Sequence, residues 1–296
     1  MDSIILTTVI MLGVLAATLA VVLFVVAQKF KVIEDARIGE TENTLPGANC
    51  GGCGYTGCRA FAEALVKADD ISNMFCPVGG NATMSKVAEV LGKTVEVKES
   101  LVAVVRCSGS CENRPRVNEF DGAVSCSVMA ATYSGDTDCS FGCFGKGDCV
   151  PVCNFDAISI NKETLLPEVD ENKCTACGAC VKACPKFIIE LRKKGIKSRR
   201  IYVSCMNKDK GAIARKACKT ACIGCAICRK NCEFDAITIE NFLAYIDADK
   251  CRLCRKCVDV CPQKSIIELN FPPRKPRIET QEIKAAGTVN TEVITN

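Results

Sequence analysis

Apolar residues are distributed unevenly along the chain, and the longest apolar run lies near the N-terminus. Residues 4–27, IILTTVIMLGVLAATLAVVLFVVA, contain no charged residue. At 1.5 Å per residue such a helix measures roughly 36 Å, enough to cross the hydrocarbon layer of a membrane with some tilt. A cleaved signal peptide is the alternative, but Asp2 precedes the run where a signal peptide carries a basic residue, and the run is too long. We therefore expect residues 1–28 to form a transmembrane anchor.

The charges that follow this run predict its orientation. Lys29 and Lys31 come directly after it, and Arg37 lies a little further on. Because basic residues favour the cytoplasmic side, we expect a single-pass protein of the inner (plasma) membrane with its N-terminus outside and the rest of the chain in the cytoplasm. A reducing cytoplasm also suits the many cysteines that follow.

The remaining apolar positions predict only short elements. RAFAEALVKA (residues 59–68) has the spacing of a helix. LVAVVRC (residues 101–107) and RIYVSC (residues 200–205) are typical of short β-strands. If these two strands pair with each other, the cysteines at their ends lie close together. Residues 270–296 show no apolar periodicity, and we expect a flexible tail there, or an extended arm on a partner subunit.

Composition shifts attention from catalysis to metal binding. The 296 residues include 25 cysteines but no histidine and no tryptophan. An odd cysteine count and repeated C-x-x-C spacings argue against a disulfide framework. Without histidine the chain lacks the commonest general base and the usual haem and Rieske ligands, so we expect no catalytic residues. A net charge of +4 makes no case for nucleic acid, and no phosphate-binding glycine motif indicates a nucleotide.

The first cysteine group follows a predicted linker (residues 29–48) and defines a small domain (residues 49–95). Its ligands are expected to be Cys50, Cys53, Cys58 and Cys76. The predicted helix between the last two returns Cys76 to a loop whose glycines allow amides to approach sulfur atoms. Four thiolates also bind zinc, but zinc sites usually arrange them as two separated C-x-x-C pairs. Three ligands in one glycine-rich loop and a distant fourth before Pro77 favour a [4Fe–4S] cluster.

The middle and the end of the chain are internal repeats. CNFDAISI (residues 153–160) matches CEFDAITI (residues 232–239), and residues 173–191 match residues 250–269. Each long segment contains the bacterial ferredoxin run C-x2-C-x2-C-x3-C-P. We therefore expect two ferredoxin-like modules (residues 139–191 and 219–269), each of which binds two [4Fe–4S] clusters.

In such modules the fourth cysteine of one run binds the cluster of the other run. The rule predicts four ligand sets: Cys139, Cys143, Cys149 and Cys184; Cys174, Cys177, Cys180 and Cys153; Cys222, Cys225, Cys228 and Cys261; and Cys251, Cys254, Cys257 and Cys232. The run that starts at Cys139 is stretched, and its assignment is the least secure of the four. A zinc-only interpretation does not explain sixteen cysteines in register.

Five cysteines remain, in a connecting segment (residues 96–138) and a basic insertion (residues 192–218). They are Cys107, Cys111, Cys126, Cys205 and Cys218. The first four would complete a sixth cluster, in which Cys218 is the alternative to Cys205; unligated thiols are the other interpretation. The insertion also contains RKKGIKSRR (residues 192–200), which is either a solvated turn or a docking patch for an acidic electron carrier.

The order of these parts resembles a known family. A single N-terminal apolar helix, GANCGGCGYTGC before a distant Cys-Pro, and tandem ferredoxin runs resemble RnfB, the iron–sulfur subunit of Rnf complexes. VRCSGSC and VSCMNKDKGAIARKAC resemble its longer, cluster-rich form found in anaerobes. The resemblance implies an α+β chain that accepts electrons from reduced ferredoxin and relays them within a membrane-bound ferredoxin:NAD oxidoreductase that translocates Na⁺ or H⁺. It also places the NADH site and the ion path on other subunits, consistent with a chain that carries no substrate chemistry of its own.

Five [4Fe–4S] clusters, and a sixth from the remaining cysteines, are therefore the expected cofactors. One alternative is an iron–sulfur polyferredoxin subunit of another membrane oxidoreductase, of the hydrogenase or formate dehydrogenase type, although those usually lack the glycine-rich first site. The other is a non-redox metal-binding scaffold. We expect the first site to hand electrons to membrane-embedded partners, and a long linker would allow that site to move.

Overall fold

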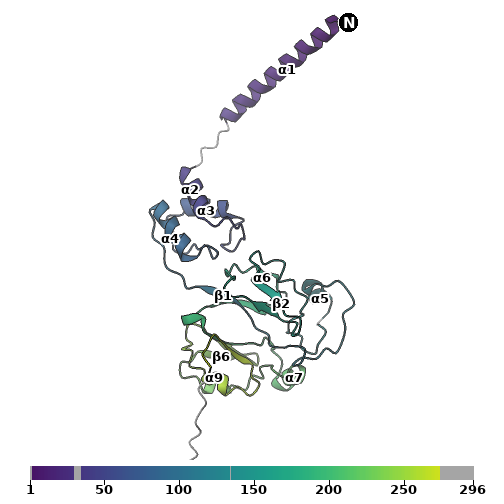
Figure 1. Cartoon of the computed structure of the whole chain (residues 1–296), viewed down its shortest axis with the longest axis vertical. Coiled ribbons are helices and arrows are strands. Elements are labelled where there is room, and N and C mark those ends of the chain that lie inside the picture. Colours follow the sequence, from purple (N-terminus) through teal and green to yellow (C-terminus); the bar gives the residue numbers. More distant parts are fainter. Residues whose placement is uncertain (1, 30–34, 134, 274–296) are drawn as a thin grey trace, which may run out of the picture.

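The structure is a computed structural model that describes residues 2–29, 35–133 and 135–273. Helix α1 (Asp2–Lys29) stands apart from the rest of the chain (Figure 1). An 18-residue window of its segment Ile5–Lys29 has a mean hydropathy of 3.0, and none of that window is buried. By length and composition this helix is able to cross a membrane, as the apolar run predicts.

Three helices form an N-terminal unit (residues 35–92) around one small core. They are α2 (Ala36–Thr44), α3 (Cys58–Lys67) and α4 (Gly80–Leu91). Helix α3 is the helix that the spacing of residues 59–68 predicts, and its apolar face buries Phe61 and Leu65. Helix α2 lies where a linker was expected: the Asp35 carboxylate caps it by accepting a hydrogen bond from Arg37 N, and Ile38 is buried in the core. The described part of the expected linker therefore contains a packed helix.

The rest of the chain forms two similar units, each with two antiparallel two-stranded sheets. In the first repeat (residues 101–193), β1 (Leu101–Val105) pairs with β4 (Ile189–Lys193), and β2 (Ile158–Ile160) pairs with β3 (Pro167–Val169). In the second repeat (residues 200–269), β5 (Arg200–Val203) pairs with β8 (Ile266–Leu269), and β6 (Ile237–Glu240) pairs with β7 (Leu243–Ile246). The other short elements are α5 (Cys126–Thr132), α6 (Ala179–Ala183), η1 (Ile196–Ser198), α7 (Gly211–Ala217), α8 (Ile227–Lys230) and α9 (Lys256–Asp259).

The pairing of residues 101–107 with residues 200–205, which the sequence left open, does not occur. Each strand pairs instead with the last strand of its own repeat, where the apolar residues that follow the Cys-Pro dipeptide offer a partner in register. The ends of β1 and β5 still meet, because Ser108 N donates a hydrogen bond to Ser204 O at 3.1 Å and the two hydroxyls lie 2.7 Å apart. The expected proximity of the two strand ends is therefore present without a shared sheet.

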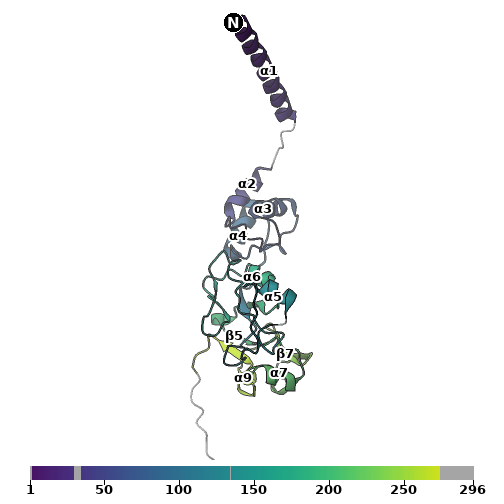
Figure 2. The same cartoon turned by 90° about the vertical axis from the view of Figure 1, so that its right-hand side faces the viewer.

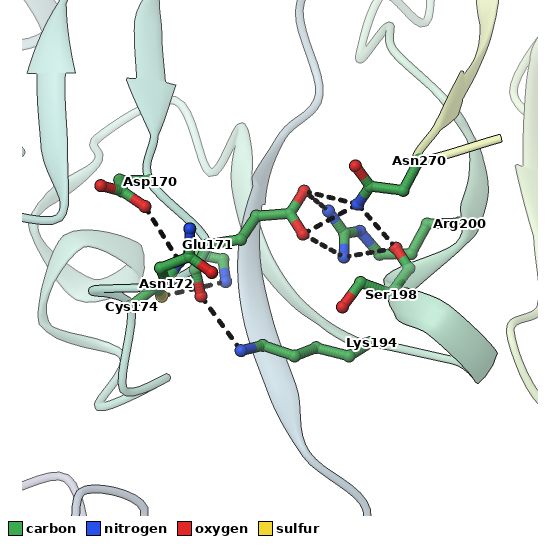
Figure 3. A network of polar contacts seen from close by, with 9 residues as sticks. Asp170, Glu171, Asn172, Cys174, Lys194, Ser198, Arg200 and Asn270 are labelled. Carbon is green, nitrogen blue, oxygen red and sulfur yellow. Dashed lines mark hydrogen bonds and ion pairs between the residues drawn. The ribbon is translucent and has the colours of Figure 1, made fainter. Parts of the chain in front are cut away.

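A polar network fastens the two repeats to each other (Figure 3). The Glu171 carboxylate, in the loop before Cys174, accepts hydrogen bonds from Arg200 on β5 and from Asn270 after β8. Lys194 Nζ donates to the Glu171 main-chain oxygen at 3.0 Å. The Arg200 side chain is only 3% exposed, so this ion pair is shielded from solvent. Asn270 belongs to the segment expected to be a tail; residues 274–296 of that segment lie outside the described residues.

The three units follow one another along the long axis of the molecule, with the first repeat in the middle (Figures 1 and 2). The N-terminal unit touches the first repeat through a cysteine loop of each. A Cβ atom on Gly52 would lie 3.0 Å from Cys177 O, so glycine is what permits this close approach. The first cysteine loop therefore packs against the first repeat in this structure.

Candidate iron–sulfur sites

The N-terminal unit brings together three of the cysteines expected at the first site, Cys53, Cys58 and Cys76, and Cys50 lies in the same loop as Cys53. Helix α3 begins at Cys58, and Asn49 Oδ1 accepts the amide hydrogen of Cys58 at 2.8 Å, which closes the loop that carries Cys50 and Cys53. After α3 the chain returns with Cys76, whose sulfur accepts a hydrogen bond from Gly79 N at 3.3 Å. Burial raises the pKa of the Cys76 thiol, and the neighbouring Cys53 and Cys58 add to the increase.

The three regular C-x2-C-x2-C runs share one unusual backbone conformation. The residues on both sides of each middle cysteine have positive φ: Ala176 and Gly178, Gly224 and Ala226, and Leu253 and Arg255. Non-glycine residues seldom adopt this left-handed conformation, because it costs roughly 1–2 kcal/mol each. Here it curls each run so that its three sulfur atoms can surround one point. Such repeated strain is typical of a binding loop.

Two of the expected sets line one small apolar cavity each. In the first repeat Cys153 joins Cys174, Cys177 and Cys180 around one cavity. In the second repeat the corresponding cavity is lined by Cys232, Cys251, Cys254 and Cys257. Backbone amides point at sulfur atoms here too, since Ala157 N donates to Cys153 Sγ at 3.4 Å. The crossing of the fourth cysteine between runs is thus present in the geometry of both repeats.

The third expected set also gathers in the second repeat. Burial, followed by the charge of the neighbouring Cys222, raises the pKa of Cys228 to about 11, and Cys225 and Cys261 contribute in the same sense. The thiols of Cys228 and Cys257 lie close enough to influence each other, so the two sets of this repeat are neighbours.

The stretched run gives a different result. A second cavity in the first repeat is lined by Cys143, Cys149 and Cys184, as expected, but its fourth cysteine is Cys126 and not Cys139. Burial, followed by the neighbouring Cys126, raises the pKa of Cys149 to about 12. The spacing rule missed Cys126 because that residue lies outside the run, at the start of α5; the only signal in the sequence is the irregular spacing itself.

Of the remaining cysteines, Cys107, Cys139 and Cys205 lie where the two repeats meet. Cys107 follows β1 and Cys205 follows β5. Burial is the largest influence on both thiols and raises the pKa of each. The nearby Cys139 adds to the increase at Cys107, and Cys107 adds to the increase at Cys205. Cys111, Cys139 and Cys143 line one cavity together with the half-buried Arg114, and Cys111 Sγ lies 3.9 Å from Thr164 O. Cys218 Sγ instead lies 3.4 Å from Thr220 Oγ1.

These groups fit an iron–sulfur cluster better than a single metal ion. Within the described ranges 2–29, 35–133 and 135–273, no three Cys, Asp or Glu side chains converge closely enough to hold one ion. Four thiols around an apolar cavity, with amide hydrogens directed at sulfur, match the wider spacing and the hydrogen bonding of a cubane cluster. Because burial raises the pKa of these thiols, their charged thiolates need a nearby cation, which iron would supply.

A basic groove borders one of the cysteine sets. Its charged lining residues are Arg192, Lys193, Lys194, Arg199, Arg200 and Arg252 against Glu99 and Asp249. Cys251 lines this groove as well as the cavity of its own set. Both acidic residues pair with Lys193, while Arg192 pairs with Glu190 and Arg200 pairs with Glu171. The excess of positive charge next to this candidate cluster site therefore comes from Lys194, Arg199 and Arg252.

Comparison with known proteins agrees with these sites. The family described as "Putative Fe-S cluster" matches residues 45–77, the "4Fe-4S binding domain" matches residues 167–190, and the "4Fe-4S dicluster domain" matches residues 221–266. The first match covers the N-terminal site, and the other two each cover part of one repeat.

Three relatives, all RnfB proteins, are similar over most of the chain. The one from the Na(+)-translocating ferredoxin:NAD(+) oxidoreductase complex of Acetobacterium woodii is 45% identical over 86% of this chain and 75% of its own length. The relative from the ion-translocating oxidoreductase complex of Methanosarcina acetivorans is 36% identical over 90% of this chain and 99% of its own length. The relative from the proton-translocating ferredoxin:NAD(+) oxidoreductase complex of Clostridium ljungdahlii is 37% identical over 90% of this chain and 93% of its own length. The chain therefore belongs to the RnfB family, the iron–sulfur electron-transfer subunits of Rnf ion-translocating ferredoxin:NAD oxidoreductase complexes.

Proposed function

We propose that this subunit accepts electrons from reduced ferredoxin and passes them, through [4Fe–4S] clusters held by its cysteines, to membrane-embedded and NAD-reducing partner subunits. A bound [4Fe–4S] cluster takes up and releases one electron at a time and breaks no substrate bond. The chain's own residues supply the thiolates, the amide hydrogen bonds and the shielding from water that tune each site.

The basic groove beside Cys251 is the observation that carries the donor assignment. Small ferredoxins are acidic, and an excess of positive charge raises the rate at which an acidic partner arrives. Arg252 lies on the exposed rim of the groove and directly follows Cys251. A ferredoxin docked there would place its own cluster near the set that contains Cys251, so we assign electron entry to that set.

Neighbouring cysteine sets support a route from the groove to the N-terminal unit. Within the second repeat, Cys257 lies near Cys228 of the next set. Within the first repeat, Cys149 lies near Cys180 of the next set. The loop of Cys177 then meets Gly52 of the N-terminal site. We therefore propose that electrons leave through the set of Cys50, Cys53, Cys58 and Cys76, the site that follows the apolar helix in the chain.

The orientation proposed for the anchor puts every cluster site on the cytoplasmic side. Lys29 ends α1, and the basic residues Lys31 and Arg37 follow it in the sequence. Basic residues next to an apolar helix favour the cytoplasmic face. This places the groove in the compartment where soluble ferredoxin is reduced, and it leaves the N-terminus of the helix outside.

The experiment compares two charge reversals beside the same cysteine set. Arg252→Glu changes the groove, whereas Lys256→Glu changes a cation near Cys254 that does not line the groove. With the anaerobically purified full chain, Arg252→Glu should slow reduction by reduced ferredoxin roughly tenfold at low salt and weaken its salt dependence. Reduction by dithionite should stay unchanged. Equal rates for wild type and Arg252→Glu, or an equal loss in Lys256→Glu, would contradict this docking site.

A further inference from the structure

Cys126 and Cys139 each lie at the site where the cysteine spacing predicts the other. Cys126 was expected among the remaining cysteines, yet it lines the cavity of Cys143, Cys149 and Cys184. Cys139 was expected in that cavity, yet it does not line it. The exchange changes the ligand sets of two sites at once.

A single carboxylate holds Cys126 in place. Asp148 Oδ1 accepts a hydrogen bond from Cys126 N at 2.8 Å, and Oδ2 accepts hydrogen bonds from Ser125 Oγ at 2.8 Å and from Ser127 N and Oγ at 3.0 Å each. Asp148 directly precedes Cys149 in the chain. These four hydrogen bonds therefore tie the start of α5 to the run and keep Cys126 beside Cys149.

Cys139 has different neighbours, on the side of the second repeat. Asn207, which is 1% exposed, donates from its backbone N to Cys205 Sγ and from its side-chain Nδ2 to Cys139 Sγ, each at 3.4 Å. One buried residue thus contacts two sulfur atoms from different repeats, one through its backbone N–H and the other through its side-chain amide. Cys111 lines the cavity next to Cys139, and Cys107 lies beside both Cys139 and Cys205.

This second group lies between two sets already described. The Cys143 amide lies next to the Cys107 thiol, and the Cys222 amide lies next to the Cys205 thiol. Cys143 belongs to the first repeat and Cys222 to the second. A cluster at this position would therefore close the gap between the two repeats along the proposed electron route.

We propose that Cys126 is the fourth ligand of the cluster held by Cys143, Cys149 and Cys184, and that Cys139 joins Cys107, Cys111 and Cys205 to hold a sixth [4Fe–4S] cluster that bridges the two repeats. Asp148 is a positioning residue for the first of these clusters, and Cys218 ligates neither. The inference rests on the proposed function in one respect, namely that the cysteine sets hold [4Fe–4S] clusters.

Paired alanine variants separate this assignment from the one that spacing predicts. Two substitutions among the ligands of one cluster remove only that cluster, whereas one substitution in each of two ligand sets removes both clusters. We expect Cys126→Ala with Cys184→Ala to lower the iron and sulfide content of the full chain by about four atoms each, as for one cluster. Cys139→Ala with Cys184→Ala should lower each by about eight. Cys218→Ala, the matched control, should retain the wild-type content.

The opposite pattern, eight atoms lost in the Cys126 pair and four in the Cys139 pair, would overturn the exchange. An unchanged iron content in Cys139→Ala alone would overturn the sixth cluster. These failures are distinct from failure of the proposed function itself, which would appear as a wild-type chain without iron and sulfide.

A milder variant tests the role of Asp148 without removal of a cysteine. Asp148→Ala removes the carboxylate that holds Cys126. The control is Asp138→Ala, which changes an exposed aspartate that directly precedes Cys139, as Asp148 directly precedes Cys149. We expect Asp148→Ala to lose iron faster than wild type under a chelator, with a loss limited to about four atoms, and to alter one reduced-cluster EPR signal. In a Cys126→Ala background the same change should have no further effect. An equal loss in Asp138→Ala, or an additive loss in the double variant, would contradict the positioning role.

Discussion

Arg114 places a positive charge between two of the candidate cluster sites, and its removal should lower their reduction potentials. Its guanidinium donates a hydrogen bond to Cys143 O and packs against the backbone at residue 142, where a Cβ atom would lie 1.8 Å from Nη1. Its charge acts to lower the pKa of both Cys107 and Cys143, although burial dominates and raises both. A cation that favours thiolate also favours the reduced, more negative cluster.

The magnitude follows from the geometry around Gly109. Arg114 Nε and Cys107 Sγ lie 3.2 and 3.5 Å from the same point, the Cβ position of residue 109, so they are no more than about 7 Å apart. Two unit charges at about 7 Å and an effective dielectric constant near 20 interact by roughly 2.4 kcal/mol. For a one-electron couple this is about 100 mV. The half-buried side chain is partly screened by solvent, so we expect Arg114→Gln to shift one or two midpoints downward by tens of millivolts.

The assay is an EPR-monitored redox titration of the anaerobically purified full chain. Arg116→Gln is the control, because Arg116 lines the same cavity but is 47% exposed and lies 4.0 Å from the Asp136 carboxylate. We expect its midpoints to match those of wild type. If all midpoints of Arg114→Gln stay unchanged, or if any moves upward, then Arg114 does not act electrostatically on a cluster and the placement of Cys107 and Cys143 is wrong.

Three further predictions concern stability and the retention of iron. Glu171→Ala should destabilise the contact between the repeats by about 3 kcal/mol, because it leaves the buried guanidinium of Arg200 without its carboxylate; thermal unfolding would measure this, and the exposed Glu163→Ala should be silent. Gly224→Ala should cost iron from one cluster, since its Cβ would lie 2.7 Å from a main-chain oxygen at a φ of +64°, whereas Ala226→Gly in the same loop should keep full iron; a chain that tolerates both would refute the importance of this loop conformation. Removal of iron by a chelator should unfold both repeats, as measured by circular dichroism, because cysteines form much of their cores; a folded apo-chain would contradict this.

Features that depend on local spacing could be predicted from the sequence. The apolar helix, α3 and the internal repeat follow from residues close together in the chain. The sets that contain Cys174 and Cys251 line cavities as expected because the crossing rule is built into one short fold. Helix α2 was missed although Asp35 is a normal N-cap residue, because the helix itself is strongly polar and shows little apolar periodicity.

Features that depend on tertiary packing were beyond the sequence pattern. β1 and β5 look alike as strands, and nothing in their residues says that each pairs with the last strand of its own repeat. The neighbours of Cys126 and Cys139 depend on hydrogen bonds from Asp148 and Asn207. Those contacts form only when α5 folds back on the run and when the two repeats meet, so cysteine spacing alone assigns the two residues the other way round.

The proposed function requires that this chain receives electrons from ferredoxin through clusters bound by its own cysteines. Its most direct test is an anaerobic titration of the iron-loaded full chain with reduced ferredoxin, followed by the loss of visible cluster absorbance. We expect bleaching that is rapid at low salt and that continues until several electrons have been taken up per chain. A chain with its full iron and sulfide content that bleaches with dithionite but stays oxidised with reduced ferredoxin would contradict the claim.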